Sequence, residues 1–253
     1  MQNPTSILIT GASSGIGEAL ANAYAAPGVH LALTGRDGAR LDAVAKACRA
    51  RGALVLAEPV AVGDAAAMAD FIRRAERAAP LELVIANAGT SAGLRHLGGL
   101  DAHTREIFAT NIDGVLNTLH PAIDLMLPRR RGQLAIVASL AGFRGLAGAA
   151  AYAASKAAVK AYGEGLRGRL AREGLQVSVI CPGFVRSRMT ARNPFPMPFL
   201  MDAARAARII RRGLARDRGR IAFPFPTFAA MWLLAALPDA LVHAIARRLP
   251  AKE

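Results

Sequence analysis

The sequence predicts an α/β fold, a doubly wound parallel sheet with helices on both faces. Short apolar runs alternate with amphipathic segments, which is typical of chains that build parallel sheets. A glycine-rich turn from Gly11 to Gly17 directly follows the first apolar run. Polar residues or glycines also follow several later runs, at the strand ends where such sheets gather their functional groups.

The first expected strand is the apolar run at residues 6–10, because it is short and ends at a glycine. Further strands are expected at 29–34, 54–57, 81–86, 133–138 and 176–180. The segments between them predict helices at 18–26, 37–51, 65–78, 103–126 and 152–172. In the second of these helices, Leu41, Val44 and Ala45 fall on one face.

The pattern loosens after residue 187. Prolines at alternate positions within 193–200 exclude a regular helix there. A helix is expected at 202–216 and a last short strand at 221–226. Residues 227–237 are apolar and uncharged, but this run is well short of the roughly 20 residues that span a bilayer. Neither a repeat nor a linker is visible, so we expect one domain over residues 1–253.

Composition excludes several classes of function. The net charge is +14, but all except four of the 32 basic residues are arginine, a bias that suggests a GC-rich coding sequence. Aromatic residues make up 5% of the chain, too few for base-stacking platforms, so nucleic-acid binding is not expected. The five histidines show no ligand spacing, and we expect no metal.

Two unrelated cysteines, Cys48 and Cys181, form neither a disulfide framework nor a zinc site. Residues 1–6 lack the basic and long apolar regions of a signal peptide. The simplest expectation is a protein of the reducing cytoplasm.

Tyr152 and Lys156 are the most informative pair in the chain. Helical positions four apart share a face, so the ammonium of Lys156 can favour the ionised phenol of Tyr152. A free tyrosine has a pKa of about 10, and lowering it to ~7 requires roughly 4 kcal/mol of differential stabilisation. Such a phenol could exchange a proton with a substrate oxygen near neutral pH.

The glycine turn predicts a site for a pyrophosphate. Glycines lack a Cβ, so the backbone at Gly11, Gly15 and Gly17 can turn sharply and approach a ligand closely. The N–H groups at the start of the following helix would bind the anion. Ser13, Ser14 and Ile16 lie in the same turn and are expected to contact the ligand as well.

Taken in order, these motifs resemble the short-chain dehydrogenase/reductase family from Ile7 to about Ser187. The resemblance implies a Rossmann-type fold, a nicotinamide cofactor, and hydride exchange with a carbonyl or an alcohol. It makes Tyr152 the general acid or base, places Ser139 on the substrate oxygen, and gives Lys156 the nicotinamide ribose as well as the tyrosine. It also assigns Asn111 to bending a helix and supporting a water relay. Further expected cofactor contacts are Asn87, Ala88, Gly89, Pro182, Gly183, Val185 and Ser187.

NADP is expected rather than NAD. NAD-specific relatives hold the ribose with an acid at the end of the second strand, where this chain has Gly35 followed by Arg36. A guanidinium suits a phosphate dianion. Ser13 or Arg40 could assist, although the neutral Ser14 replaces a basic residue of many NADP-using relatives.

Two positions depart from the family pattern. Ala86 replaces an asparagine, and Ala61 replaces an aspartate that contacts adenine, for which Asp64 is a possible substitute. Either change could weaken the adenine pocket or loosen the sheet, but neither touches the proton-transfer groups.

Substrate choice is assigned to residues 90–100 and to a lid at 188–201. The lid is rich in proline, phenylalanine and methionine, which favours an apolar or partly apolar carbonyl compound. A sugar substrate stays open, because Arg95, Arg186 and Arg188 flank the same region. The resemblance also implies a homodimer or homotetramer.

Two alternatives come from other classes of protein. One is a dinucleotide-binding sensor without turnover. The other is a peripheral membrane scaffold held by the apolar and basic extension at 221–253. The hypothesis of a membrane scaffold rests on residues 228–234 and on four arginines that fall on one helical face, Arg205, Arg208, Arg212 and Arg216.

Overall fold

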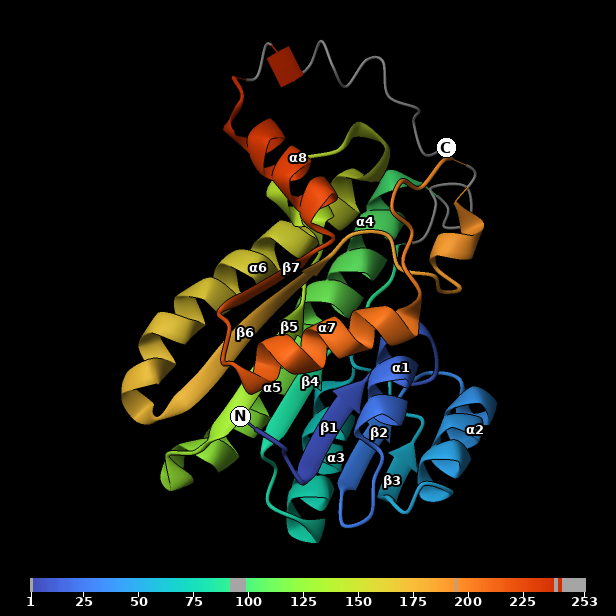
Figure 1. The fold of residues 1–253 in the computed structure, drawn as a ribbon, viewed down its shortest axis with the longest axis vertical. Coiled ribbons are helices and arrows are strands. Elements are labelled where there is room, and N and C mark those ends of the chain that lie inside the picture. The colour runs from blue at the N-terminus through green and yellow to red at the C-terminus, as the bar shows by residue number, and fades with distance from the viewer. Residues whose placement is uncertain (1, 92–98, 194, 239–240, 243–253) are drawn as a thin grey trace.

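The computed structural model describes residues 2–91, 99–193, 195–238 and 241–242 (Figure 1). Seven strands form one sheet in the order β3-β2-β1-β4-β5-β6-β7, and all its neighbouring strands are parallel. The sheet confirms the predicted doubly wound α/β fold. Its strands are β1 (Ser6–Thr10), β2 (His30–Thr34), β3 (Leu54–Glu58), β4 (Leu83–Ala86), β5 (Gly132–Val137), β6 (Leu175–Pro182) and β7 (Arg220–Phe223).

Helices cover both faces of the sheet. Helices α1 (Gly15–Tyr24), α2 (Gly38–Arg49) and α7 (Ala203–Ala215) bury their apolar sides in one core layer. Helices α3 (Ala65–Ala78), α5 (Gly114–Met126) and α6 (Ala150–Leu170) form the other. Strand β1 contributes to both layers, because successive side chains alternate between faces: Ile7 and Ile9 join the first layer and Leu8 the second.

The connections fix where the ligand crevice lies. The chain moves outward from β1 to β2 and β3, and then returns across β1 to β4. The strand order therefore reverses between β1 and β4, and connections leave these two strands toward opposite sides of the sheet. In open α/β sheets, ligands bind in the crevice at this reversal, outside the carboxyl ends of the strands.

The single helix predicted at 103–126 is broken in the structure. Helix α4 (Leu100–Phe108) is followed by a π-helical turn (Ala109–Asp113) and then by α5. Such a turn carries one extra residue per turn and is frequent at functional sites. It places Asn111 in the protein interior, where its side chain is fully buried.

The strand predicted at 221–226 was too long. Strand β7 ends at Phe223, and α8 (Phe225–Ala236) begins directly after Pro224. Pro226 stands in the first helical turn, where a missing N–H costs nothing. The apolar run at 227–237 is therefore mostly helical. Figure 1 shows α8 rising beyond the carboxyl ends of the strands.

Within the described residues, no helix is both long enough and apolar enough to cross a bilayer. Part of the expected substrate segment, residues 92–98 with Arg95, lies outside the described residues. So does most of the C-terminal extension beyond residue 238.

Candidate active site

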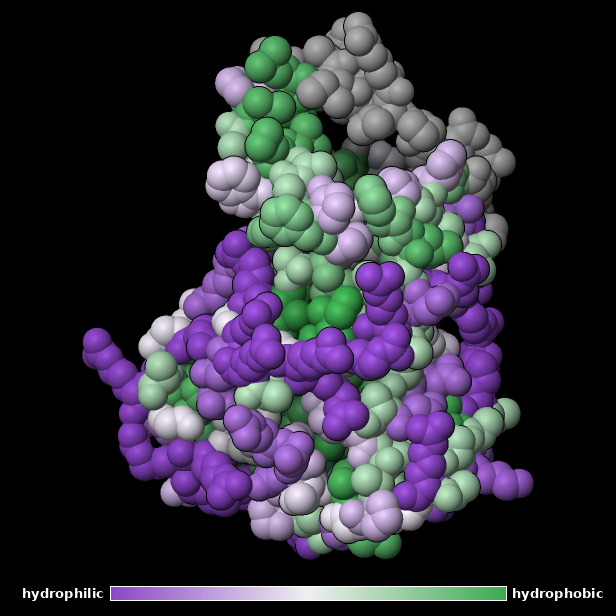
Figure 2. All heavy atoms as spheres, viewed as in Figure 1, coloured by the Kyte–Doolittle hydropathy of each residue, from purple (hydrophilic) through white to green (hydrophobic). Residues whose placement is uncertain are grey.

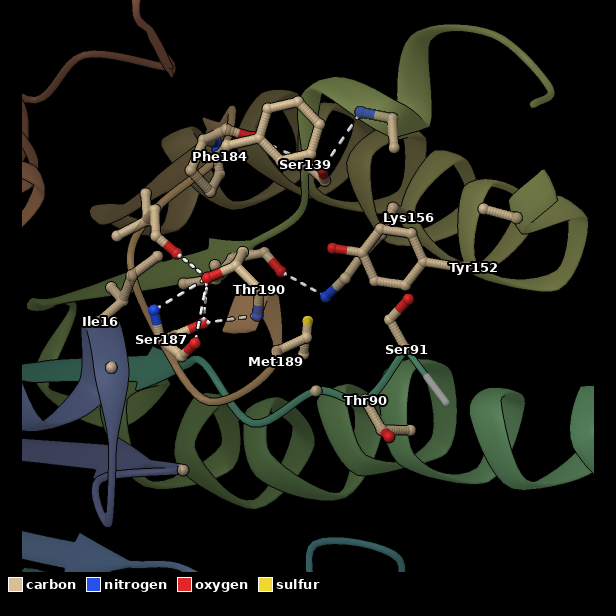
Figure 3. Close-up of a pocket in the computed structure, with 18 of the residues that line it drawn as sticks. Ile16, Thr90, Ser91, Ser139, Tyr152, Lys156, Phe184, Ser187, Met189 and Thr190 are labelled. Carbon is tan, nitrogen blue, oxygen red and sulfur yellow. Dashed lines mark hydrogen bonds between the residues drawn. The ribbon is translucent and has the colours of Figure 1, made fainter. Parts of the chain in front are cut away.

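A cavity of about 1440 Å³ opens at the carboxyl ends of the strands. Sixteen of the expected site residues line it, and only Gly17 and Asn111 do not. Figure 3 shows Tyr152 and Lys156 on one wall, and Ser187 and Thr190 on the other beside Ile16. The lining residues are Gly11, Ser13, Ser14, Gly15, Ile16, Arg36, Asn87, Ala88, Gly89, Ser139, Tyr152, Lys156, Pro182, Gly183, Val185 and Ser187.

The glycines of the first turn have no room for side chains. Gly11 has a φ of +66°, and a Cβ there would lie 2.8 Å from Ala88 Cα. A Cβ on Gly17 would overlap the carbonyl oxygen of Gly11, so Gly17 packs α1 onto the turn and has no place in the cavity wall. Ser14 precedes α1 without a side-chain capping bond. The first N–H groups of α1 are thus left for an anion, which fits a dinucleotide.

Asn87 lines the cavity, but its side-chain amide makes its hydrogen bonds within the protein. Its Nδ2 donates to the carbonyl oxygens of Thr10 at 2.8 Å and Gly11 at 3.2 Å. The Thr10 hydroxyl accepts in return from the backbone N–H groups of Asn87 and Ala88. Asn87 therefore ties β4 to the glycine turn. Thr10, which the sequence analysis missed, shares this task.

At the end of β2, Gly35 packs against Ser13. A Cβ on Gly35 would lie 2.8 Å from Ser13 Oγ, so no acidic side chain fits there without displacing Ser13. Arg36 is exposed on the cavity rim and has no hydrogen-bond or ion-pair partner among the described residues. Arg40 also lines the cavity, where it pairs with Asp37 at 2.5 Å.

Asp64 does not replace the missing adenine aspartate. Its carboxylate caps α3 by accepting from the N–H of Ala67 at 2.9 Å, and it does not line the cavity. Ala61 does line the cavity, between Val60 and Val62. This part of the wall therefore offers apolar contacts to a planar ring.

Helix α6 carries Tyr152 and Lys156 on its cavity side. The Lys156 ammonium lies 5.9 Å from the centre of the Tyr152 ring and donates to the Val137 carbonyl at 2.9 Å. Ser139 follows β5, where its Oγ accepts from the N–H of Ala141 at 3.1 Å and donates to the Pro182 carbonyl at 3.4 Å. The three expected polar groups thus meet at one wall.

Burial dominates the pKa of Tyr152 in this structure: it raises the pKa of the phenol, and the Ser139 hydroxyl only partly offsets this effect. The lowered pKa expected from the sequence combined Lys156 with a positively charged oxidised nicotinamide and stays a prediction. Burial also lowers the pKa of Lys156 to about 8. In this structure the phenol is therefore neutral at pH 7, whereas the lysine is still mostly charged.

Asn111 lies behind the cavity wall and holds two elements together. Its Oδ1 accepts from the N–H of Thr90 at 2.8 Å, while Nδ2 donates to the Thr90 carbonyl and to Ser155 Oγ, both at 3.0 Å. Gly89 fits between this amide and Lys156, because a Cβ there would lie 3.2 Å from both side chains. Thr90 and Ser155 complete this network. Ser155 was not among the expected site residues, and Thr90 was expected only as the start of a segment that chooses the substrate.

Ser187 lies at the start of the loop that contains the expected lid. Its N–H donates to Thr190 Oγ1 at 2.9 Å, and Thr190 returns a bond to the Val185 carbonyl at 2.9 Å. Ser187 also lies against the glycine turn, since a Cβ on Gly15 would be 3.1 Å from Ser187 Cβ. Thr190 was missed, although a hydroxyl three residues after Ser187 is a recognisable turn signal.

Backbone pairing holds together the chain on the two sides of the lid segment. Val185 bridges Met201 in parallel, and the N–H of Arg186 donates to the Met201 carbonyl at 2.8 Å. From this segment, Met189, Phe195, Pro196 and Pro198 line the cavity. Arg188 lines it too, but Arg186 is exposed and pairs with Asp202 at 3.0 Å.

The family model of the short chain dehydrogenases matches residues 5–195. The chain belongs to this family. A curated relative, an uncharacterized oxidoreductase of Myxococcus xanthus, is 40% identical over 243 residues, covering 96% of each chain. A galactitol 2-dehydrogenase (L-tagatose-forming) of Cereibacter sphaeroides is 34% identical, over 73% of this chain and 72% of its own.

Among solved structures, this short-chain dehydrogenase is similar to one from Sphingobium yanoikuyae in complex with NADPH. The two share 26% sequence identity with a TM-score of 0.78, over 98% of this chain and 97% of the other. The family uses a nicotinamide dinucleotide, and the glycine turn and the cavity described above fit such a cofactor.

Proposed function

We propose that this short-chain dehydrogenase interconverts an apolar ketone and its secondary alcohol with NADP(H), using Tyr152 for proton transfer. One observation carries the proposal. Tyr152 and Ser139 lie on the cavity wall between the anion-binding turn and an apolar lid, and the Ser139 hydroxyl acts to lower the pKa of the phenol. A carbonyl oxygen placed at that wall would meet two hydroxyl donors.

The cofactor would be held by the residues at the sheet end. N–H groups at the start of α1 bind the pyrophosphate, and Ser187 borders the same turn. The unpaired guanidinium of Arg36, with Ser13 and Arg40 beside it, favours the extra phosphate of NADP. The NADPH complex of a similar structure supports this choice. A bound nicotinamide supplies the hydride.

The protein supplies the proton. In reduction, Ser139 donates a hydrogen bond to the carbonyl oxygen, and Tyr152 gives its phenolic proton to that oxygen as the carbon gains a hydride. The phenolate left behind is stabilised by the Lys156 ammonium and regains a proton from solvent. Asn111 is a positioning residue that acts through Thr90 and Ser155. Burial raises the pKa of Tyr152, so the phenol carries its proton near pH 7 and can act as the acid in reduction.

Apolar side chains around the reacting wall define the substrate. The Cereibacter relative acts on a polyol, so membership of the family does not determine the substrate. Here Leu146, Phe184, Met189, Phe195 and Met231 line the cavity, and they match an apolar or partly apolar ketone. We assign residues 188–201 to the lid of a single catalytic domain.

The test uses loss of NADPH absorbance against a panel of aliphatic and aryl ketones. Tyr152→Phe removes only the phenolic oxygen, so kcat/KM should fall by about 10²- to 10⁴-fold while the Kd for NADPH hardly changes. Tyr162→Phe is the matched control, because Tyr162 lies on the same helix but hydrogen-bonds His120 on the surface. Full turnover in Tyr152→Phe would refute the assignment.

The same experiment separates the enzyme from a dinucleotide-binding sensor. Tight NADPH binding by the wild type with no turnover across the panel would favour the sensor. Cytoplasmic location and a homodimer or homotetramer stay predictions of the sequence.

A further inference from the structure

Helix α8 has an apolar surface on both of its sides. Thr227, Met231 and Leu234 line the cavity. On the other side, Phe225, Trp232 and Leu233 are 74%, 55% and 56% exposed. No charged residue occurs in the helix, whose sequence is FPTFAAMWLLAA. Exposed apolar surface of this kind marks an interaction site.

Unpaired positive charge lies on the same face of the molecule. Arg205, Arg208 and Arg212 on α7, and Arg216 at its end, are exposed and have no carboxylate partner among the described residues. The acids at the two ends of α7 are already paired, Asp202 with Arg186 and Asp217 with Arg167. Figure 2 shows the green surface of α8 above a purple band that crosses the position of α7 in Figure 1.

We propose that α8 and the α7 arginines dock this protein on an anionic membrane surface. Large apolar side chains would enter the region between headgroups and acyl chains, while the arginines bind the lipid phosphates. Trp232 suits this position, because indole rings prefer the membrane interface. With 12 residues, α8 is too short to span a bilayer and would lie in the interface.

The positive charge of this face argues against a second copy of the chain as its binding partner. A symmetric pair formed through this face would bring two sets of unpaired arginines together, and like charges repel across an interface. The chain as a whole carries a net charge of +14, which favours a negative partner for this face.

The two sides of α8 connect the docking surface to the cavity. A substrate dissolved in the bilayer would reach the residues of the inner side without crossing bulk water. This second step rests on the proposed function, whereas docking itself does not.

Docking can be measured without turnover, because Trp232 is the only tryptophan of the chain. The probe is the intrinsic emission of the full protein with phosphatidylcholine vesicles, with and without phosphatidylglycerol. Anionic vesicles should shift the emission to the blue and brominated lipids should quench it, and raised salt should weaken both effects. Emission that stays unchanged with anionic vesicles would overturn docking. So would a blue shift without vesicles that grows with protein concentration, which indicates self-association.

Two variants and their controls test the named residues by vesicle co-sedimentation. F225S/L233S keeps the reporter and should lower the partition coefficient by about tenfold or more. R205Q/R208Q/R212Q should lower it by a similar factor at low salt. The matched controls, L54S on β3 and R77Q/R169Q/R172Q on the opposite face of the sheet, should pellet like the wild type. Docking is wrong if the α8 and α7 variants pellet like these controls.

Substrate entry has its own readout. F225S/L233S should lower kcat/KM for a ketone presented in anionic vesicles and leave kcat/KM for a short water-soluble ketone unchanged. Equal values for both ketones would overturn entry through the bilayer. Vesicle binding by a protein that reduces no ketone would keep docking and remove the proposed function.

Discussion

Asn111 donates a hydrogen bond of 3.0 Å to Ser155 Oγ, although the two residues are 44 positions apart in the chain. Both side chains are fully buried. The Ser155 hydroxyl in turn donates to the Tyr152 carbonyl at 2.8 Å. The π-helical turn is thereby fastened to the part of α6 that carries Tyr152 and Lys156, and the position of both groups depends on a hydroxyl that never meets the cavity.

Ser155→Ala is the first prediction. It leaves one N–H of the buried Asn111 amide without an acceptor, so the free energy of unfolding should fall by about 1–3 kcal/mol. Urea denaturation measures this loss. Thr104→Ala is the control, because Thr104 makes a comparable helical hydrogen bond on the surface at 2.8 Å. Equal losses in the two variants would show that the buried network has no special weight.

Arg36→Ala should change the choice of cofactor. Removing the guanidinium takes away the proposed contact to the extra phosphate of NADP, so KM for NADPH should rise by about tenfold or more. KM for NADH and kcat at saturating cofactor should stay close to wild type. Arg77→Ala, an exposed arginine on α3, serves as the control. A parallel loss with both cofactors would contradict the assignment of Arg36.

An acid at residue 35 should fail to create an NAD enzyme by itself. Gly35→Asp puts a Cβ 2.8 Å from Ser13 Oγ, so the glycine turn must shift and binding of both cofactors should weaken. The double variant S13G/G35D removes the obstructing side chain and should bind NADH more tightly than Gly35→Asp. Titration of each cofactor by fluorescence measures this. Strong NADH binding by the single variant would show that Ser13 moves aside at little cost.

Lys156 should make stability depend on pH in alkaline solution. Its pKa is lowered to about 8 by burial, whereas an unfolded lysine has its ordinary pKa of 10.5. Between these values the unfolded chain binds more protons, so the free energy of unfolding rises with pH, by about 3 kcal/mol at most. Below pH 8 this contribution is lost.

The comparison with Lys156→Met isolates that contribution from other groups. The free energy of unfolding of the wild type minus that of Lys156→Met, measured by urea denaturation from pH 7 to 10.5, should increase with pH. A flat difference would mean that Lys156 keeps an ordinary pKa in the folded protein. Burial raises the pKa of Cys181 to about 12, which opposes the lysine effect in both proteins, and the charge of Lys156 acts to lower this pKa in the wild type alone.

Most of the fold followed from the sequence, because most strands are short apolar runs that stop at or just before a glycine, asparagine, serine or proline. The apolar pattern did not predict the breaks in regular structure, although the family resemblance assigned Asn111 to bending a helix. A π-helical turn adds one residue without altering the apolar period enough to be noticed around Asn111. Helix α8 has apolar residues on most of its surface, so no helical period distinguishes it from a strand, and the expected strand was continued through the prolines at 224 and 226.

The sequence predicted which residues line the candidate site better than it predicted what each of them does there. Motif spacing brought nearly all the expected residues to one cavity. It could not show that the Asn87 amide turns inward to the Thr10 carbonyl, because that depends on how β1 and β4 lie side by side. It also could not show that burial raises the pKa of the Tyr152 phenol, since burial is a property of the whole packed wall.

The bridge between Val185 and Met201 has a consequence for engineering. Both residues are buried in the sheet layer, and the backbone bonds between their neighbours bring the two ends of the intervening loop together. A loop of another length or composition could be grafted between Thr190 and Met201 without altering the register of β6 and β7, and Ser187 would keep its place beside the glycine turn. Substrate range could then be exchanged as a module while the dinucleotide half of the molecule keeps its shape.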